Sequence, residues 1–88
     1  MATMDLFDVQ KQLSTITTKP SEEDVASALG IDVKSVNLYD EKIDDGDDNG
    51  GYVMVRCFTI EMPDQTIIAR FYYGSEDEEV GNVDCRPY

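Results

Sequence analysis

The 88-residue chain carries 19 acidic residues against 7 Lys and Arg, so its formal net charge at pH 7 is −12. This balance argues against direct binding to DNA, RNA or anionic lipid, because neutralising phosphates requires clustered Lys and Arg. It permits binding to cations or to a basic partner protein. The length predicts a single domain over residues 1–88. The residue patterns described below divide it into a helical part over 1–31 and a sheet over 34–88.

The distribution of apolar residues predicts a folded protein without a membrane segment. Hydrophobic residues make up 41% of the chain, which is more than a disordered chain contains, and they cluster in runs. The longest run, residues 66–73, is too short to span a bilayer and contains Arg70. The first ten residues, MATMDLFDVQ, have acids where a secretory signal has a basic region. We therefore expect a soluble, cytoplasmic protein that has no membrane partner.

Two helices are predicted in the first third of the chain. Within residues 5–16, apolar side chains recur at steps of three and four residues and make one helix face, namely Leu6, Val9, Leu13 and Ile16. The second helix follows Ser21, which can cap it together with Asp24 three positions on. Gly30 then provides a left-handed stop, and Ile31 is placed to pack back on the helix.

From Val36 onward, short runs rich in Val, Ile, Tyr and Phe are typical of strands. The four candidate segments are 35–43, 51–62, 66–74 and 80–88. Pairing Met62 with Gln65 across a Pro-Asp turn places Ile60 opposite Ile67, although a slip by one residue stays open. The predicted fold class is α+β, with two N-terminal helices packed on one face of a three- or four-stranded antiparallel β-meander. Whether residues 80–86 form the fourth strand is left open.

The negative charge is concentrated in two segments. Residues 40–51 have a net charge of −5 and residues 74–88 have a net charge of −4, whereas residues 52–73 between them are neutral. In an antiparallel meander, the first and third connections lie at the same end of the sheet, about 10 Å apart. We therefore predict an acidic lobe at this end, formed by residues 44–48 and 76–79. The predicted partner-binding residues are Asp44, Asp45, Asp47, Asp48, Glu76, Asp77, Glu78, Glu79 and Tyr52.

The stretch DDGDDNGGY, residues 44–52, also matches the beginning of a calcium-binding loop. Asp45, Asp47, Asn49 and Gly50 fall at positions 1, 3, 5 and 6 of that pattern. Position 12 should be a bidentate Glu but is Arg56, and the flanking segments are predicted strands rather than helices. Asp45, Asp47 and Asn49 thus remain a candidate for weak divalent-cation binding, and no specific metal site is predicted.

Two further readings of the sequence are disfavoured. Residues 22–39 have the spacing of the first half of a helix-turn-helix motif, but the segment that should read DNA offers only Lys34 as a base. The chain has no His, so Ser-His and Cys-His nucleophile arrangements are absent, and it has no glycine-rich phosphate loop. We expect neither enzymatic activity nor a cofactor.

The two cysteines, Cys57 and Cys85, are 28 positions apart, which fits neither a CxxC pair nor a zinc ligand set. We interpret them as small apolar residues on strands. A disulfide between them would require their strands to be neighbours.

The resulting hypothesis is a non-enzymatic protein whose acidic lobe occupies a basic, nucleic-acid-binding surface of another protein. In size, charge and lack of catalytic groups, the chain resembles the small acidic inhibitors of phages and mobile elements, among them anti-restriction and anti-CRISPR proteins that mimic DNA. No family motif is matched. One alternative is a small structural or assembly subunit that homodimerises through its apolar sheet, and monomer and homodimer both stay open. The other alternative is a module that binds divalent cations weakly.

Overall fold

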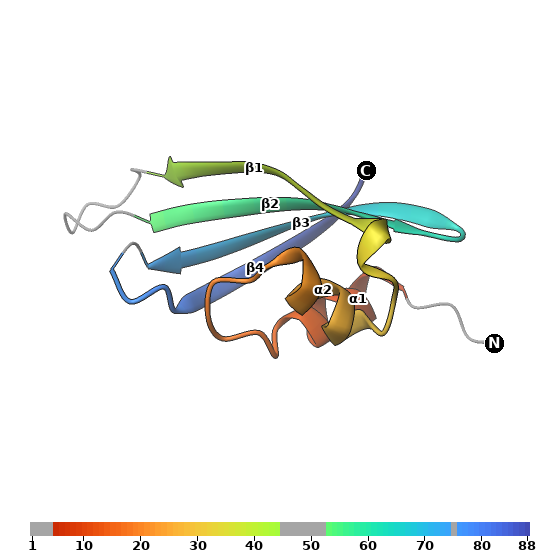
Figure 1. Ribbon diagram of the computed structural model, residues 1–88, viewed down its shortest axis with the longest axis horizontal. Coiled ribbons are helices and arrows are strands. Elements are labelled where there is room, and N and C mark those ends of the chain that lie inside the picture. The colour runs from red at the N-terminus through yellow and green to blue at the C-terminus, as the bar shows by residue number, and fades with distance from the viewer. Residues whose placement is uncertain (1–4, 45–52, 75) are drawn as a thin grey trace.

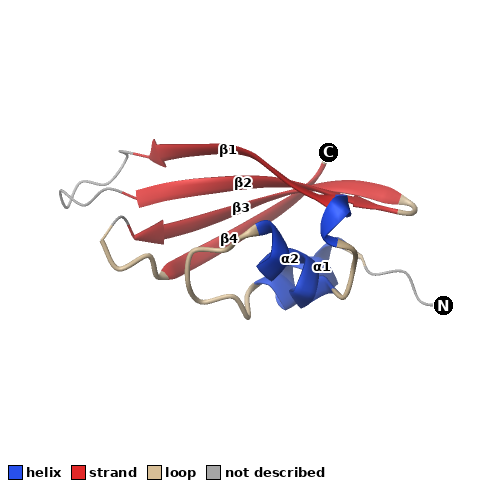
Figure 2. Cartoon of the chain, in the orientation of Figure 1, coloured by secondary structure: helices blue, strands red, loops and turns tan. Residues whose placement is uncertain are grey.

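The computed structural model describes residues 5–44, 53–74 and 76–88. The elements along the chain are α1 (Leu6–Leu13), α2 (Glu22–Leu29), the 3-10 turn η1 (Val33–Ser35), β1 (Val36–Asp44), β2 (Val53–Met62), β3 (Gln65–Gly74) and β4 (Val80–Pro87). The strands form one antiparallel sheet in the order β1-β2-β3-β4, and both helices lie on the same side of it (Figures 1 and 2). The predicted α+β fold is confirmed, with four strands.

Helix α1 is shorter than the sequence predicted. Asp5 caps its N-terminus by accepting a hydrogen bond from the backbone N–H of Asp8 at 2.8 Å. The helix stops at Leu13, because the hydroxyls of Ser14 and Thr15 bond back to backbone carbonyls of the last turn and compete with its continuation. Ile16, predicted as the last residue of the helical face, lies beyond the helix but still packs against the core.

Helix α2 has both predicted ends. The Ser21 hydroxyl accepts from the Asp24 N–H, and the Asp24 carboxylate accepts from the Ser21 N–H, which is a complete capping box. At the other end, Gly30 has φ 68° and Ile31 donates its N–H to the Ala26 carbonyl at 3.0 Å. This left-handed stop sends the chain back toward the sheet.

Gly30→Ala is expected to lower the free energy of unfolding by about 1 kcal/mol, because an L residue is strained at positive φ. A Cβ at this position meets no atom within 4 Å, so the cost comes from the backbone rather than from a clash. Gly81→Ala is a matched control, because Gly81 also has open space around it but is not in the left-handed region. Urea unfolding of both variants checks the prediction, and equal stabilities would contradict it.

The register of the central hairpin is the predicted one. Met62 pairs with Gln65 and Ile60 pairs with Ile67, with the turn at Pro63 and Asp64 between them. Strand β1 departs from regular pairing, because a bulge between Leu38 and Asp40 shifts its register on β2. Beyond the bulge, Glu41 pairs with Arg56, so Glu41 shares the face of the sheet that packs on the helices.

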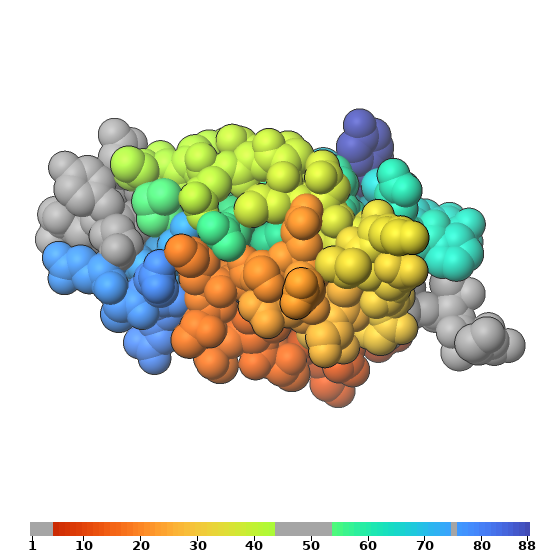
Figure 3. All heavy atoms as spheres, in the orientation of Figure 1, coloured from red at the N-terminus to blue at the C-terminus, as the bar shows by residue number. Residues whose placement is uncertain are grey.

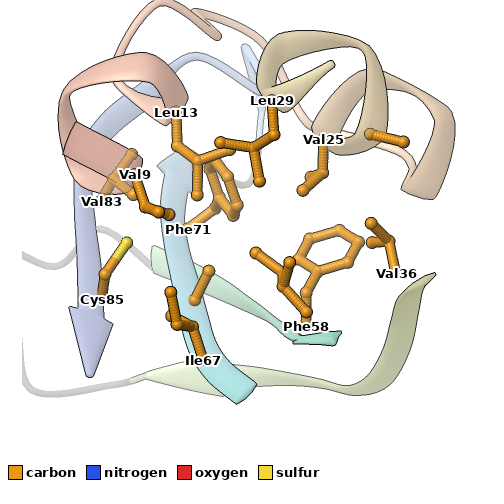
Figure 4. Close-up of a cluster of buried hydrophobic side chains, with 13 residues drawn as sticks. Val9, Leu13, Val25, Leu29, Val36, Phe58, Ile67, Phe71, Val83 and Cys85 are labelled. Atoms are coloured by element: carbon orange, nitrogen blue, oxygen red, sulfur yellow. The ribbon is translucent and has the colours of Figure 1, made fainter. Parts of the chain in front are cut away.

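The core lies between the helices and one face of the sheet (Figure 4). Phe58 on β2 and Phe71 on β3 are fully buried, and their rings meet edge to face with centroids 5.5 Å apart. Val9 and Leu13 of α1 and Val25 and Leu29 of α2 close this layer from the other side. Among the described residues, no helix is both long enough and apolar enough to cross a membrane.

The structure answers one question that the sequence left open, the pairing of the cysteines, and bears out the rejection of a helix-turn-helix motif. Cys57 and Cys85 are both buried and both free. They cannot pair with each other, because β3 lies between their strands and Cys85 faces the helical core whereas Cys57 faces away from it. The second helix of a helix-turn-helix motif is not formed, because residues Val33–Ser35 make a single 3-10 turn that leads directly into β1.

Candidate acidic binding surface

The meander brings the first and third connections to one end of the sheet. Asp44, the last residue of β1, pairs with Val53, the first residue of β2, and Val53 pairs with Gly74 at the end of β3. The β3–β4 connection leaves at this end, whereas the β2–β3 turn lies at the opposite end (Figures 1 and 3). The predicted placement of the two acidic connections is therefore correct at the level of strand topology.

The β3–β4 connection is a tight turn. The Glu78 N–H donates to the Gly74 carbonyl at 3.0 Å, and the Gly74 N–H donates to the Glu79 carbonyl at 3.1 Å. Asp77 accepts a hydrogen bond from the Glu79 N–H at 3.0 Å through its side chain, and Glu78 has φ 57°. These bonds fix the backbone direction from which the acidic side chains project.

A second set of bonds ties this turn to the segment between the helices. The Lys19 N–H donates to the Glu78 carbonyl and the Val80 N–H donates to the Thr17 carbonyl, each at 2.8 Å. Thr18 and Glu79 form an antiparallel bridge between these two bonds. The acidic connection is thus held from two sides, by β3 and by the segment between the helices, so the helical layer positions it as well as the sheet.

The four acids of this connection differ in what they contact. All four are exposed. The Glu78 carboxylate forms an ion pair with the Lys19 ammonium at 2.9 Å, and the Asp77 carboxylate shapes the turn. The carboxylates of Glu76 and Glu79 make no ion pair or hydrogen bond with any described residue. Glu76 and Glu79 therefore carry the charge in this connection that is most readily available to a partner.

The other half of the predicted lobe lies outside the described residues. This applies to the partner-binding candidates Asp45, Asp47, Asp48 and Tyr52, and to the cation candidate Asn49 together with Asp45 and Asp47. The structure gives the backbone of Asp44 as the last residue of β1 but not its side chain.

A polar cluster that the sequence analysis missed lies on the helix-facing side near the same end. Glu41 accepts hydrogen bonds from the Arg56 guanidinium and from the Tyr73 hydroxyl, each at 2.6 Å. Arg56 also donates to the Pro20 carbonyl at 2.6 Å, and its side chain is only 15% exposed. Strand β1, strand β2, strand β3 and the segment before α2 are therefore joined by one hydrogen-bonded cluster, defined by Glu41, Arg56 and Tyr73.

The cluster shifts the protonation of its members. Hydrogen bonds from Tyr73 and then from Arg56 hold the pKa of Glu41 below its ordinary value. Burial, together with the hydrogen bond to Glu41, raises the pKa of Tyr73 to about 12. Glu41 is thus an ionised carboxylate whose charge is compensated inside the fold by Arg56.

Comparison of the chain with protein-family models, with curated proteins and with solved structures found no match. The fold and the charges define a small α+β protein with an acidic end.

Proposed function

We propose that the chain is a non-enzymatic binding protein that docks its acidic lobe on a basic, nucleic-acid-binding surface of another protein. The observation that supports this most is the arrangement of the meander, which lets both acidic connections leave at one end of the sheet. The hydrogen bonds that hold residues 77–80 add preorganisation, since a fixed backbone loses less entropy on binding than a free loop.

The negative charge of the acidic lobe is comparable to that of a short segment of duplex DNA. The lobe, residues 44–48 and 76–79, holds eight acids and no base. Duplex DNA carries one charge per about 1.7 Å of its axis, so eight charges correspond to about 14 Å of duplex. This is comparable to the roughly 10 Å that separates two connections two strand spacings apart, with side-chain length added. Such crowding is repulsive in the free protein and is relieved when a basic surface is bound.

The experiment is affinity capture from a lysate with two sets of charge reversals. The first set, Glu76→Lys with Glu79→Lys, alters the two described carboxylates that no fold contact uses. The second set adds lysines at Asp44, Asp45, Asp47 and Asp48. We expect the first set to weaken capture of a basic, nucleic-acid-binding protein by about 30-fold or more and the second to abolish it, because each close charge pair contributes roughly 1–2 kcal/mol or more.

The matched control reverses the same number of charges at the opposite end of the sheet. Glu61 and Asp64 are exposed residues beside and within the β2–β3 turn, so Glu61→Lys with Asp64→Lys gives the same net charge as the first set. This control should capture the partner as the wild type does. Retained capture after reversal of the full lobe, or equal loss in the control, would refute docking through the acidic lobe.

A further inference from the structure

The two edges of the sheet differ in how their backbone groups are satisfied. The strand order places β1 at one edge and β4 at the other, and β1 forms the upper edge in Figure 1. An edge strand points the N–H and C=O of every second residue away from the sheet, where another strand can pair with them. Which residues of β1 point these groups outward follows from the register.

On β2, successive residues bond alternately to β3 and to β1. Met62 and Gln65 flank a two-residue turn and form a hydrogen-bonded pair. In an antiparallel ladder such pairs recur at every second residue, so the backbone groups of Phe58 bond to β3. The backbone groups of Cys57 and Val55, which lie one and three residues before Phe58, therefore point to β1.

The outward groups of β1 follow from this alternation. Asp40 and Lys42 are the β1 partners of Cys57 and Val55, so their N–H and C=O point to β2. In the residues that alternate with them, Glu41 and Ile43, the backbone N–H and C=O point away from the sheet. The direction of the backbone groups is separate from that of the side chain, which in Glu41 faces the helical side.

The first half of this edge is satisfied by contacts within the chain. The Val36 N–H donates to the Val33 carbonyl of the 3-10 turn, and the Leu38 N–H donates to the Glu22 carboxylate at 2.7 Å. Both donors point away from β2, which agrees with the alternation derived from the turn. Beyond the bulge, the outward N–H groups have no bond to a described residue. We refer to residues 40–44 as the free half of β1.

The opposite edge is covered at three places along β4. At its start, residues 17–19 pair with residues 78–80 through two backbone hydrogen bonds of 2.8 Å. In the middle, the Gln10 side chain donates to the Val83 carbonyl at 3.2 Å, and α1 contacts the strand. Near its end, Pro87 has no N–H to donate. An added strand therefore meets two successive residues with unbonded groups on the free half of β1, whereas on β4 such a series is interrupted.

The charges of the free half disfavour a second copy of the chain. Two copies that satisfy the outward groups of both residues pair antiparallel, with Glu41 of each opposite Ile43 of the other. Lys42 then lies opposite Lys42, and Asp40 lies opposite Asp44. Like charges directly opposite each other destabilise a pair of strands, so this edge is not suited to its own copy.

The same charges define the kind of segment that fits. The Asp40 side chain is 46% exposed, so a base on an added strand can reach it. Bases opposite Asp40 and Asp44 are attracted, and a neutral residue fits opposite Lys42 between them. On the other face, Ile43 is 60% exposed, and an apolar residue opposite it removes apolar surface from water.

We propose that the free half of β1 binds an extended, basic segment of a partner protein as a fifth strand of the sheet. The outward N–H and C=O groups of Glu41 and Ile43 bond to the backbone of this segment, and the acids at positions 40 and 44 select Lys or Arg on it. The proposal is independent of docking through the acidic lobe, because it depends on the edge of β1 alone.

A short peptide tests the proposal on the isolated chain. The probe is acetyl-Thr-Lys-Val-Thr-Val-Lys-Thr-amide, which as an added strand places its valines opposite Glu41 and Ile43 and its lysines opposite Asp40 and Asp44. Titration followed by the amide chemical shifts in NMR spectra should give a dissociation constant below about 1 mM. The amides of Glu41 and Ile43 should be among those that shift most. Unshifted amides at these two residues would overturn the proposal.

Two further peptides separate backbone pairing from charge. N-methylation of both valine amides keeps every side chain but removes two donors, and glutamate in place of both lysines keeps the backbone but reverses the charge. Each change should raise the dissociation constant at least about tenfold. Undiminished binding of the N-methylated peptide would refute strand pairing. Undiminished binding of the glutamate peptide would refute the selection of bases.

Ile43→Pro tests the same pairing from the side of the chain. The Ile43 N–H does not bond to β2, so proline is tolerated here as on other edge strands, but it removes an outward donor. We expect the dissociation constant of the lysine peptide to rise at least about fivefold. Ile43→Val is the matched control, because valine has as many side-chain carbons as proline and keeps the N–H, and it should bind within about twofold of the wild type.

Circular dichroism should show both variants folded. Equal affinities of Ile43→Pro and Ile43→Val would overturn the proposal. So would shifts of the Glu41 and Ile43 amides that depend on the concentration of the chain without peptide, because a second copy would then occupy the edge.

Discussion

Phe58→Ala is expected to lower the free energy of unfolding by about 3–5 kcal/mol, the largest effect of any single substitution considered for this chain. Phe58 is fully buried, and its ring packs edge to face on Phe71 while helix α2 covers it from above. The substitution removes this apolar contact and leaves a cavity between two layers that cannot both collapse into it. A domain of 88 residues has a total stability of roughly 4 to 13 kcal/mol, so the substitution should remove between about a quarter and all of it.

Urea unfolding followed by circular dichroism measures this effect, with Phe7→Ala as the matched control. Phe7 is on α1 but is 76% exposed, so the same truncation there should change the stability by less than about 0.5 kcal/mol. Similar losses in the two variants would show that the layer between helices and sheet is not the core.

Glu41→Gln is expected to lower the stability by about 2 kcal/mol at neutral pH, the second largest effect. The substitution keeps the size of the side chain. It removes the negative charge to which Arg56 and Tyr73 each donate a hydrogen bond at 2.6 Å. Arg56, whose side chain is 15% exposed, is then left without its counter-charge. The magnitude stays well below that of a fully buried pair, because the Glu41 side chain is 35% exposed and solvent screens its charge.

The pH dependence of this loss has a definite sign. The hydrogen bonds hold the pKa of Glu41 below its ordinary value of 4.5, so its stabilisation is fully present above pH 4.5 and disappears as the pH falls through the lowered pKa. The stability difference between wild type and Glu41→Gln should therefore be constant from pH 7 down to about 5 and shrink below pH 4.5. Comparing the two proteins at each pH cancels the contribution of the other carboxylates.

Asp40→Asn serves as the control for this series. Asp40 neighbours Glu41 on β1, but its side chain is 46% exposed, and its carboxylate is as far as 4.0 Å from the Lys42 ammonium. Removing the Asp40 charge should lower the free energy of unfolding by about 0.5 kcal/mol or less. A gap between wild type and Glu41→Gln that widens toward low pH would contradict the role assigned to the cluster.

The parts of the fold that follow from local chemistry were predictable from the sequence. The Ser21 and Asp24 capping box and the Gly30 stop depend on residues three to five positions apart. The pairing of Met62 with Gln65 depends on a two-residue turn. In each case one short segment contains all the interacting groups, so the residue pattern determines the geometry.

The Glu41, Arg56 and Tyr73 cluster could not be predicted, because it depends on the bulge in β1. The strict alternation of a strand would place Asp40 and Lys42 on the face of Leu38, toward the helices. The bulge between Leu38 and Asp40 inverts this order and turns Glu41 inward instead. One signal was present: Arg56 alternates in step with Phe58 and Ile60, which marks a charged residue on a core-facing position that needs a partner.

For the acidic connection between β3 and β4, the end of the sheet at which it lies was predictable, but its contacts were not. Strand order alone placed residues 76–79 at the same end as Asp44. The backbone hydrogen bonds that tie Glu78 and Val80 to the segment between the helices join residues about sixty positions apart. No local sequence pattern predicts such bonds. They bring Lys19 next to Glu78, whereas the carboxylates of Glu76 and Glu79 have no contact with a described residue.

The most direct test of docking through the acidic lobe is the affinity of the chain for its captured partner, measured by titration over rising NaCl concentration and with duplex DNA as competitor. Docking on a nucleic-acid-binding surface predicts that the affinity falls steeply with salt and that DNA displaces the chain from the partner. An affinity that does not change with salt, or a partner that binds DNA and the chain at the same time, would contradict it.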